Sequence, residues 1–100
     1  MEIKIYEGNL ELIVIKNLIA ANLDEQIKKA KAGLNENKEI ENVLLNLESV
    51  SEIDSLGINL IVGLYKQVSG EGKTFSVINA SKPIKNLFNL FKLSSYFEVS

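Results

Sequence analysis

Two stretches of this chain repeat apolar residues at the spacing of a helix face, and short apolar runs lie before, between and after them. Within residues 23–34 the apolar positions stand at i, i+4, i+7 and i+11, and residues 58–68 carry a second stripe. Residues 43–47, between the two stripes, are almost continuously apolar, which is typical of a strand covered on both faces. Strands that alternate with helices in this way indicate βαβ units, in which parallel strands are joined by right-handed crossovers.

The two ends of the chain complete the pattern. Residues 3–6 and 10–15 have the alternation of strands and flank a Gly8-Asn9 turn signal, so we expect an antiparallel hairpin. The second of these runs is apolar on both faces at its end, which favours a more central place in the sheet. Residues 75–78 and 96–99 resemble two further strands that enclose a third helix. The sequence therefore predicts an α/β fold of order β-β-α-β-α-β-α-β, with a mixed sheet of four or five strands flanked by three or four helices.

Residue types that cap helices precede the first and third predicted helices. Asn22, followed three residues later by Glu25, forms a capping-box pattern at the first. Ser81 is the expected cap of the third, where Pro83 is tolerated in the first turn. The apolar face of this third helix is expected to comprise Ile84, Leu87, Phe88 and Phe91, which we interpret as core rather than as a ligand pocket.

Composition excludes several classes of function. The chain has 100 residues, the size of one domain, and we assign residues 1–100 to a single domain. It contains no Cys and no His, so a Ser-His-Asp triad, a cysteine nucleophile and a thiolate metal site are impossible. The net charge of −2 gives no support for nucleic-acid binding. We predict no catalytic residue, no metal site and no cofactor.

The sequence carries no targeting or membrane signal that we recognise. Its N-terminus lacks the basic start and apolar stretch of a signal peptide. The most apolar window, residues 56–65, contains Asn59 and is about half as long as a bilayer-spanning helix, which needs roughly 20 residues. We therefore expect a cytoplasmic protein that does not insert into a membrane.

The turn before the second predicted helix is the first place to look for function. Ligands of α/β sheets gather beyond the carboxyl ends of the strands, where helix N-termini also point. Asp54 and Ser55 stand at such a helix start, where free backbone N–H groups and the helix dipole favour an anion. From position alone, these residues are either plain helix caps or the site of a phosphate on Ser55.

Residues 43–58, continuing into 62–67, resemble the signature of STAS domains, in particular the bacterial anti-sigma factor antagonists. The family pattern is a hydrophobic strand, a short polar loop, and Asp-Ser-[Ser/Thr]-Gly-[Leu/Ile] at the start of a helix. Here the corresponding residues are Asp54-Ser55-Leu56-Gly57-Ile58. The order of elements and the closing segment, residues 81–88, also fit, so the resemblance extends over nearly the whole chain.

The resemblance implies a partner-switching mechanism. In that family the unphosphorylated antagonist binds an anti-sigma factor that is itself a serine kinase. The kinase phosphorylates the serine after the aspartate, and the phosphorylated antagonist no longer binds. A phosphatase then removes the phosphate. The matching serine is Ser55, Asp54 would shape the turn, and Gly57 would allow a close approach. The partner-binding residues that we expect are Ile19, Ala20, Asp54, Ser55, Leu56, Gly57 and Asn59.

Two positions depart from the family pattern. Leu56 stands where a hydroxyl residue is common, and Ala20 stands where relatives carry an acid near the phosphorylation site. The loss of the acid at Ala20 leaves a more apolar group of residues, Leu18, Ile19 and Leu56, which is interpreted either as a partner-docking patch or as core.

These departures leave a second function open. The alternative is a STAS scaffold that is not phosphorylated, such as a regulatory subunit of a transporter or part of a signalling complex. A small α/β enzyme has the least support, because without His or Cys its catalytic groups must come from other residue types. In either regulatory case we expect a monomer or a weak dimer.

Overall fold

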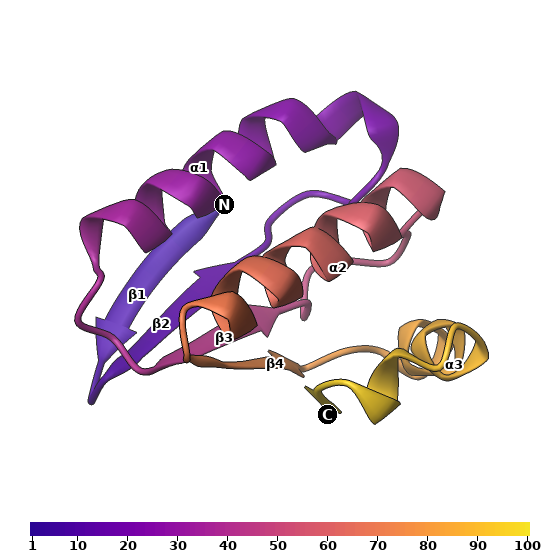
Figure 1. Ribbon diagram of the computed structural model, residues 1–100. Coiled ribbons are helices and arrows are strands. Elements are labelled where there is room, and N and C mark those ends of the chain that lie inside the picture. Colours follow the sequence, from indigo (N-terminus) through magenta and orange to yellow (C-terminus); the bar gives the residue numbers. More distant parts are fainter.

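The computed structural model describes residues 1–100 as a five-stranded sheet with helices packed against it (Figure 1). The elements follow the predicted order, with a 3-10 turn before α1 and another before β5. The predicted α/β class and mixed sheet are therefore confirmed. The elements are β1 (Glu2–Tyr6), β2 (Asn9–Ile13), η1 (Ala20–Asn22), α1 (Leu23–Glu36), β3 (Asn42–Asn46), α2 (Ser55–Gly70), β4 (Thr74–Ile78), α3 (Lys82–Leu90), η2 (Leu93–Ser95) and β5 (Glu98–Val99).

The strands lie in the sheet in their order along the chain, β1-β2-β3-β4-β5. β1 is antiparallel to β2, and the other neighbouring pairs are parallel. The hairpin turn consists of Glu7 and Gly8, both with positive φ (51° and 80°), which is the backbone of the tight turns that match strand twist. The predicted turn pair is displaced by one residue, because Asn9 already pairs with Tyr6 as part of β2.

Helices α1 and α2 lie side by side over one face of the sheet (Figure 1). Because successive parallel strands are also neighbours in the sheet, right-handed crossovers place both helices on the same face. Strand residues that point toward the helices are buried, and the core continues into the inner faces of α1 and α2. Its fully buried members include Leu10, Leu12, Val43, Leu45, Val77, Ala30 and Ile61.

The opposite face of the sheet carries a polar network around Glu11, which is only 8% exposed. One carboxylate oxygen of Glu11 accepts a hydrogen bond from the Tyr6 hydroxyl at 2.7 Å, and the other accepts one from Asn46 Nδ2 at 2.8 Å. The hydrogen bond from Asn46 is the main cause that lowers the pKa of the Glu11 carboxyl. Both oxygens are satisfied, so burial of this charge leaves no unpaired acceptor.

Helix α1 does not begin with the predicted capping box. Asn22 occupies the N-cap position, but its side chain donates to the backbone carbonyl of Asn17 at 3.0 Å and does not bond to the first turn of the helix. Ser81 likewise precedes α3 without a side-chain cap, although Pro83 lies in the first turn as expected. The Asn22 side chain therefore makes a hydrogen bond to the preceding loop in place of the capping hydrogen bond to the first turn of α1.

Three of the four residues predicted for the apolar face of α3 pack inward: Ile84, Leu87 and Phe88. The prediction is wrong for Phe91, which is 51% exposed. The helix ends before Phe91, and the chain then turns through Lys92, whose φ is 58°. The regular helical spacing therefore no longer applies at Phe91.

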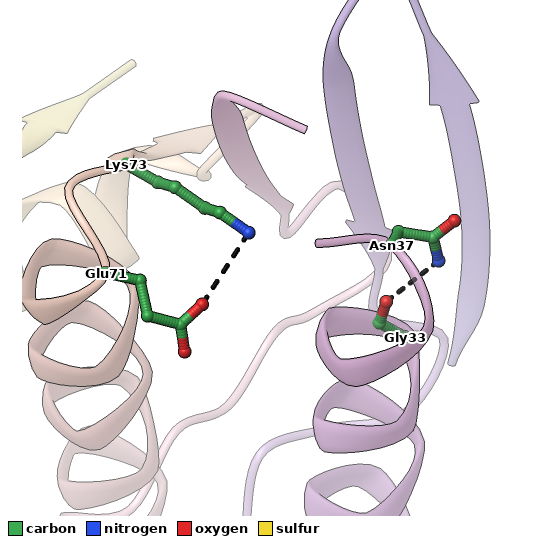
Figure 2. Close-up of polar contacts among 4 residues, drawn as sticks. All are labelled: Gly33, Asn37, Glu71 and Lys73. Atoms are coloured by element: carbon green, nitrogen blue, oxygen red, sulfur yellow. Dashed lines mark hydrogen bonds and ion pairs between the residues drawn. The ribbon is translucent and has the colours of Figure 1, made fainter. Parts of the chain in front are cut away.

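Local polar contacts lie at or just beyond the C-terminal ends of α1 and α2, as Figure 2 shows. Asn37 Nδ2 donates to the carbonyl of Gly33 at 2.8 Å, and Lys73 Nζ lies 3.6 Å from a carboxylate oxygen of Glu71. Helix α2 ends at Gly70, and Gly72 just beyond it takes a positive φ of 77°. No helix is long and apolar enough to cross a bilayer.

Candidate functional site

Ser55 is the first residue of α2, at the end of the molecule where the parallel strands finish. Its side chain is exposed. Asp54, and not Ser55, is the helix N-cap, because an Asp54 oxygen accepts the backbone N–H of Gly57 at 2.8 Å. The cap is therefore supplied by the neighbouring residue, and the Ser55 hydroxyl is not needed for it.

The Asp54 carboxylate also joins α2 to a second loop. Its other oxygen accepts the backbone N–H of Ala20 at 2.8 Å, in the segment between β2 and α1. The hydrogen bonds from Gly57 and then Ala20 are the leading causes that lower the pKa of Asp54. Asp54 is therefore ionised at neutral pH, and its charge lies beside Ser55.

Gly57 is required by a close approach of two backbones. A Cβ at this position would collide with the carbonyl oxygen of Leu18 and would also crowd the side chain of Ile53. The predicted role of Gly57 in allowing a close approach thus has a specific partner within the chain. Gly57 itself is buried.

Backbone hydrogen bonds pair the two loops like short parallel strands. Leu18 N donates to the carbonyl of Glu52 and Asp54 N donates to the carbonyl of Leu18, both at 3.1 Å, around an isolated Leu18–Ile53 bridge. Leu18 is fully buried. It therefore belongs to the core and not to the apolar patch that the sequence left open.

Asn17 is the residue of this site that the sequence interpretation missed. Its side-chain oxygen accepts the backbone N–H groups of Ser51 at 2.9 Å and Glu52 at 3.2 Å. Its backbone carbonyl accepts the hydrogen bond from Asn22 described above. Asn17 thus holds the loop before Ser55 from one side, while Asp54 holds it from the other.

The remaining predicted residues surround Ser55 at different depths. Ala20, Leu56 and Asn59 are exposed, and Ile19 is half-buried. Leu56 is 51% exposed, although leucine is among the residue types most often buried. Of the apolar group left open by the sequence, Ile19 and Leu56 stay accessible at the surface.

Two recesses border this surface. A groove of about 490 Å³ between α1 and α2 includes Ala20, Leu56 and Asn59, and a shallow hollow of about 380 Å³ between the loop and α3 includes Ile19 and Asp54. No group of three acidic side chains is placed to hold a metal ion. The site consists of an exposed hydroxyl on a rigid turn with partly apolar surroundings, a geometry that suits recognition by another molecule.

The STAS domain family model matches residues 1–100, and the chain belongs to this family. The anti-sigma F factor antagonist of Paenibacillus polymyxa is 24% identical over an alignment 85 residues long, and the match covers 82% of this chain and 66% of that protein. The chain therefore spans just under two thirds of the length of this relative.

Solved structures agree with the family. A candidate anti-sigma factor antagonist from Thermotoga maritima has a TM-score of 0.80 at 23% identity, covering 98% of this chain and 83% of the other. The antagonist SpoIIAA in its unphosphorylated form has a TM-score of 0.67 at 17% identity, covering 89% and 81%. At these identities the likeness shows the fold, and the chain is similar to anti-sigma factor antagonists in both sequence and fold.

Proposed function

We propose that this protein is a cytoplasmic anti-sigma factor antagonist that binds an anti-sigma serine kinase through the surface around Ser55. Phosphorylation of Ser55 ends the binding, and a serine phosphatase restores the unmodified form. The chain acts by binding and has no catalytic residue of its own. The observation that carries the proposal is the exposed Ser55 at the first position of α2, with Asp54 as the cap beside it.

A phosphate on Ser55 is compatible with the fold. It adds about −1.5 to −2 charges at the amino end of α2, where unpaired N–H groups and the helix dipole favour negative charge. The cap does not depend on the Ser55 hydroxyl, because Asp54 already accepts the Gly57 N–H. Modification therefore leaves the turn intact.

The same phosphate acts on the partner and not within the chain. The sequence contains no arginine, so no bidentate arginine–phosphate pair can form inside this protein and hold the phosphate away from the surface. In a docked complex the added charge lies beside the ionised Asp54 and must be desolvated. Reversal of binding from 1:99 to 99:1 requires roughly 5.5 kcal/mol of differential affinity, and a desolvated phosphate is a reasonable source of much of it.

The docking surface comprises the exposed residues near Ser55 on both loops. Ala20, Leu56 and Asn59 contribute accessible contacts, and Ile19 contributes part of its side chain. Asp54 and Gly57 act by shaping the turn, since one is the cap and the other is buried under the Leu18 carbonyl. Leu56 is the expected centre of the contact, because it is a large apolar side chain that remains 51% exposed beside Ser55.

Phosphate transfer tests the proposal directly. The purified chain is incubated with ATP and the anti-sigma serine kinase of the same genome, and intact mass spectrometry measures the product. We expect the addition of one phosphate, which Ser55→Ala abolishes and Ser49→Ala, in the same exposed loop, does not. Transfer that persists in Ser55→Ala contradicts the site.

Binding provides the second measurement. Isothermal titration with the same kinase is expected to lose affinity on Ser55→Glu and on Leu56→Asn. The matched control is Leu90→Asn, because Leu90 is an exposed leucine, 76% accessible, at the end of α3, and it lines neither recess beside Ser55. Equal losses from Leu56→Asn and Leu90→Asn exclude the proposed docking surface.

A scaffold that is not phosphorylated is the second candidate. The observation that favours it is the apolar character of Leu56 and Ala20 on either side of the Ser55 turn, since a permanent complex gains from apolar contacts. Co-purification with a transporter ATPase or another STAS protein, without phosphate on Ser55 in the cell, selects this function over partner switching.

A further inference from the structure

The groove between α1 and α2 continues well beyond the Ser55 turn. No segment of the chain covers it. Its apolar lining comes from both helices and from the turn before α1, and consists of Ala20, Leu23, Ile27, Leu56, Leu60 and Leu64. Along α2 it extends from Leu56 to Gln67, about 16 Å of helix axis. A volume of about 490 Å³ with a mostly apolar lining is in the range of sites for small organic ligands.

Gly63 keeps this groove open. It lies in the interior of α2, lines the groove, and a Cβ added there would meet no atom within 4 Å. Glycine is unfavourable inside a helix, and no contact within the chain requires it at this position. Its absent side chain leaves space for something other than this chain.

Charged side chains stand at opposite ends of the groove. Asp24, close to the Ser55 end, and Lys31 lie on the same face of α1, two turns and about 10 Å apart. Lys31 is the only cation that lines the groove, and the Gln67 amide faces the same end from α2. An anionic group is therefore favoured beside Lys31, with the apolar surface between the two charges. A cation beside Asp24 gains less, because Asp24 stands in the first turn of α1, where the helix dipole and free N–H groups already offset its charge.

We propose that the groove binds an anionic amphiphile, a medium-chain acyl group whose carboxylate pairs with Lys31 and whose tail lies against Ile27, Leu60 and Leu56. Lys31 and Gln67 supply donors for the head group, and the missing side chain at Gly63 leaves room for the tail. The inference concerns the chain alone and does not depend on a kinase or on modification of Ser55.

Titration with dodecanoate below its micelle concentration tests the proposal, by calorimetry and by NMR shifts of the groove residues. We expect saturable binding at one site, with no comparable binding of dodecyltrimethylammonium. Lys31→Glu is expected to weaken dodecanoate about tenfold, the effect of losing one charge-assisted contact. Lys28→Glu, an exposed lysine on the same helix outside the groove, is the matched control and leaves affinity unchanged.

A second pair of variants tests the shape of the groove. Gly63→Leu fills the open space and is expected to weaken dodecanoate at least about tenfold, while Gly70→Ala, at an equally open position of α2, does not. Circular dichroism confirms that both variants remain folded. Absence of binding, equal binding of the cationic amphiphile, or affinity unchanged by Lys31→Glu and Gly63→Leu overturns the proposal. Self-association of the free chain that Leu56→Asn removes also overturns it, by assigning the groove to a second copy.

Discussion

Helices α1 and α2 begin at the same end of the molecule, yet their starts are built in different ways. α2 has a side-chain cap, because Asp54 accepts the Gly57 N–H, and the same carboxylate reaches the loop before α1. α1 begins after a 3-10 turn with Asn22 turned away from its first N–H groups. One start is fixed by its own sequence and tied to its neighbour, while the other depends on contacts within the loop that precedes it.

The difference between the two helix starts shows that a capping residue in the sequence caps its helix only where no tertiary contact takes its side chain. Both starts carry a residue type that favours capping, and only Asp54 uses it. Asn22 instead donates to Asn17, whose side chain supports the loop before Ser55. Helix α1 therefore lacks a side-chain cap, and the loop before it contributes the contacts that stabilise the Ser55 turn.

Substitution of Gly57 is expected to have the largest effect. Gly57→Ala places a methyl group against the Leu18 carbonyl, which forces the two loops apart and is expected to lower the free energy of unfolding by about 2 to 3 kcal/mol. Urea unfolding followed by circular dichroism measures it. Gly63→Ala in the same helix is the control and is expected to stabilise by about 0.5 to 1 kcal/mol, because its Cβ meets open space. A neutral Gly57→Ala would show that the close approach is unimportant.

The next effect is expected at Asp54 and depends on pH. In the folded chain the backbone N–H groups of Gly57 and Ala20 hold the pKa of this carboxyl below its ordinary value of 3.8. The charged form therefore stabilises the fold above that value, and the contribution is lost as the pH falls through the lower folded pKa. Asp54→Asn should thus be less stable than the parent chain at neutral pH. Unfolding midpoints measured toward acid should converge, and a gap that stays constant with pH contradicts the role of the charge.

Much of this architecture was predictable because it follows from periodic burial. The alternation in residues 10–15 and the stripes of α1 and α2 indicated which faces meet, and a buried face constrains fold class strongly. The prediction for Phe91 is wrong because periodicity does not show where a helix ends. Helix α3 ends at Leu90, and the chain takes a left-handed conformation at Lys92, directly after Phe91.

The site was predictable only in part, for a related reason. Asp54, Ser55 and Gly57 are contiguous, so a short motif was enough to select them. The side-chain oxygen of Asn17 accepts hydrogen bonds from Ser51 and Glu52, which lie 34 and 35 positions further along the chain. Nothing in the sequence around Asn17 indicates these two partners. The available signal was an Asn in the loop between β2 and α1, because Asn side chains commonly form loop hydrogen bonds.

Asn17 is expected to show a smaller but measurable effect. Asn17→Ala leaves the N–H groups of Ser51 and Glu52 without their acceptor, at an expected cost of about 1 to 2 kcal/mol. Asn17→Asp retains the acceptor oxygen and should recover much of this loss. Hydrogen exchange of the Ser51 and Glu52 amides provides the local measurement. Exchange that does not change in Asn17→Ala shows that these bonds do not hold the loop.

Asn22 is expected to have the smallest effect, and it distinguishes the two kinds of helix start. If Asn22 capped α1, its replacement by Ala would cost about 1 kcal/mol. Its side chain instead makes a single hydrogen bond to the Asn17 carbonyl, in a partly buried setting, so Asn22→Ala should cost about 0.5 kcal/mol. Glu25→Ala should be neutral, because the reciprocal half of a capping box has no partner here. If Glu25→Ala lowers the free energy of unfolding as much as Asn22→Ala does, α1 has a capping box after all, and the two helix starts are alike.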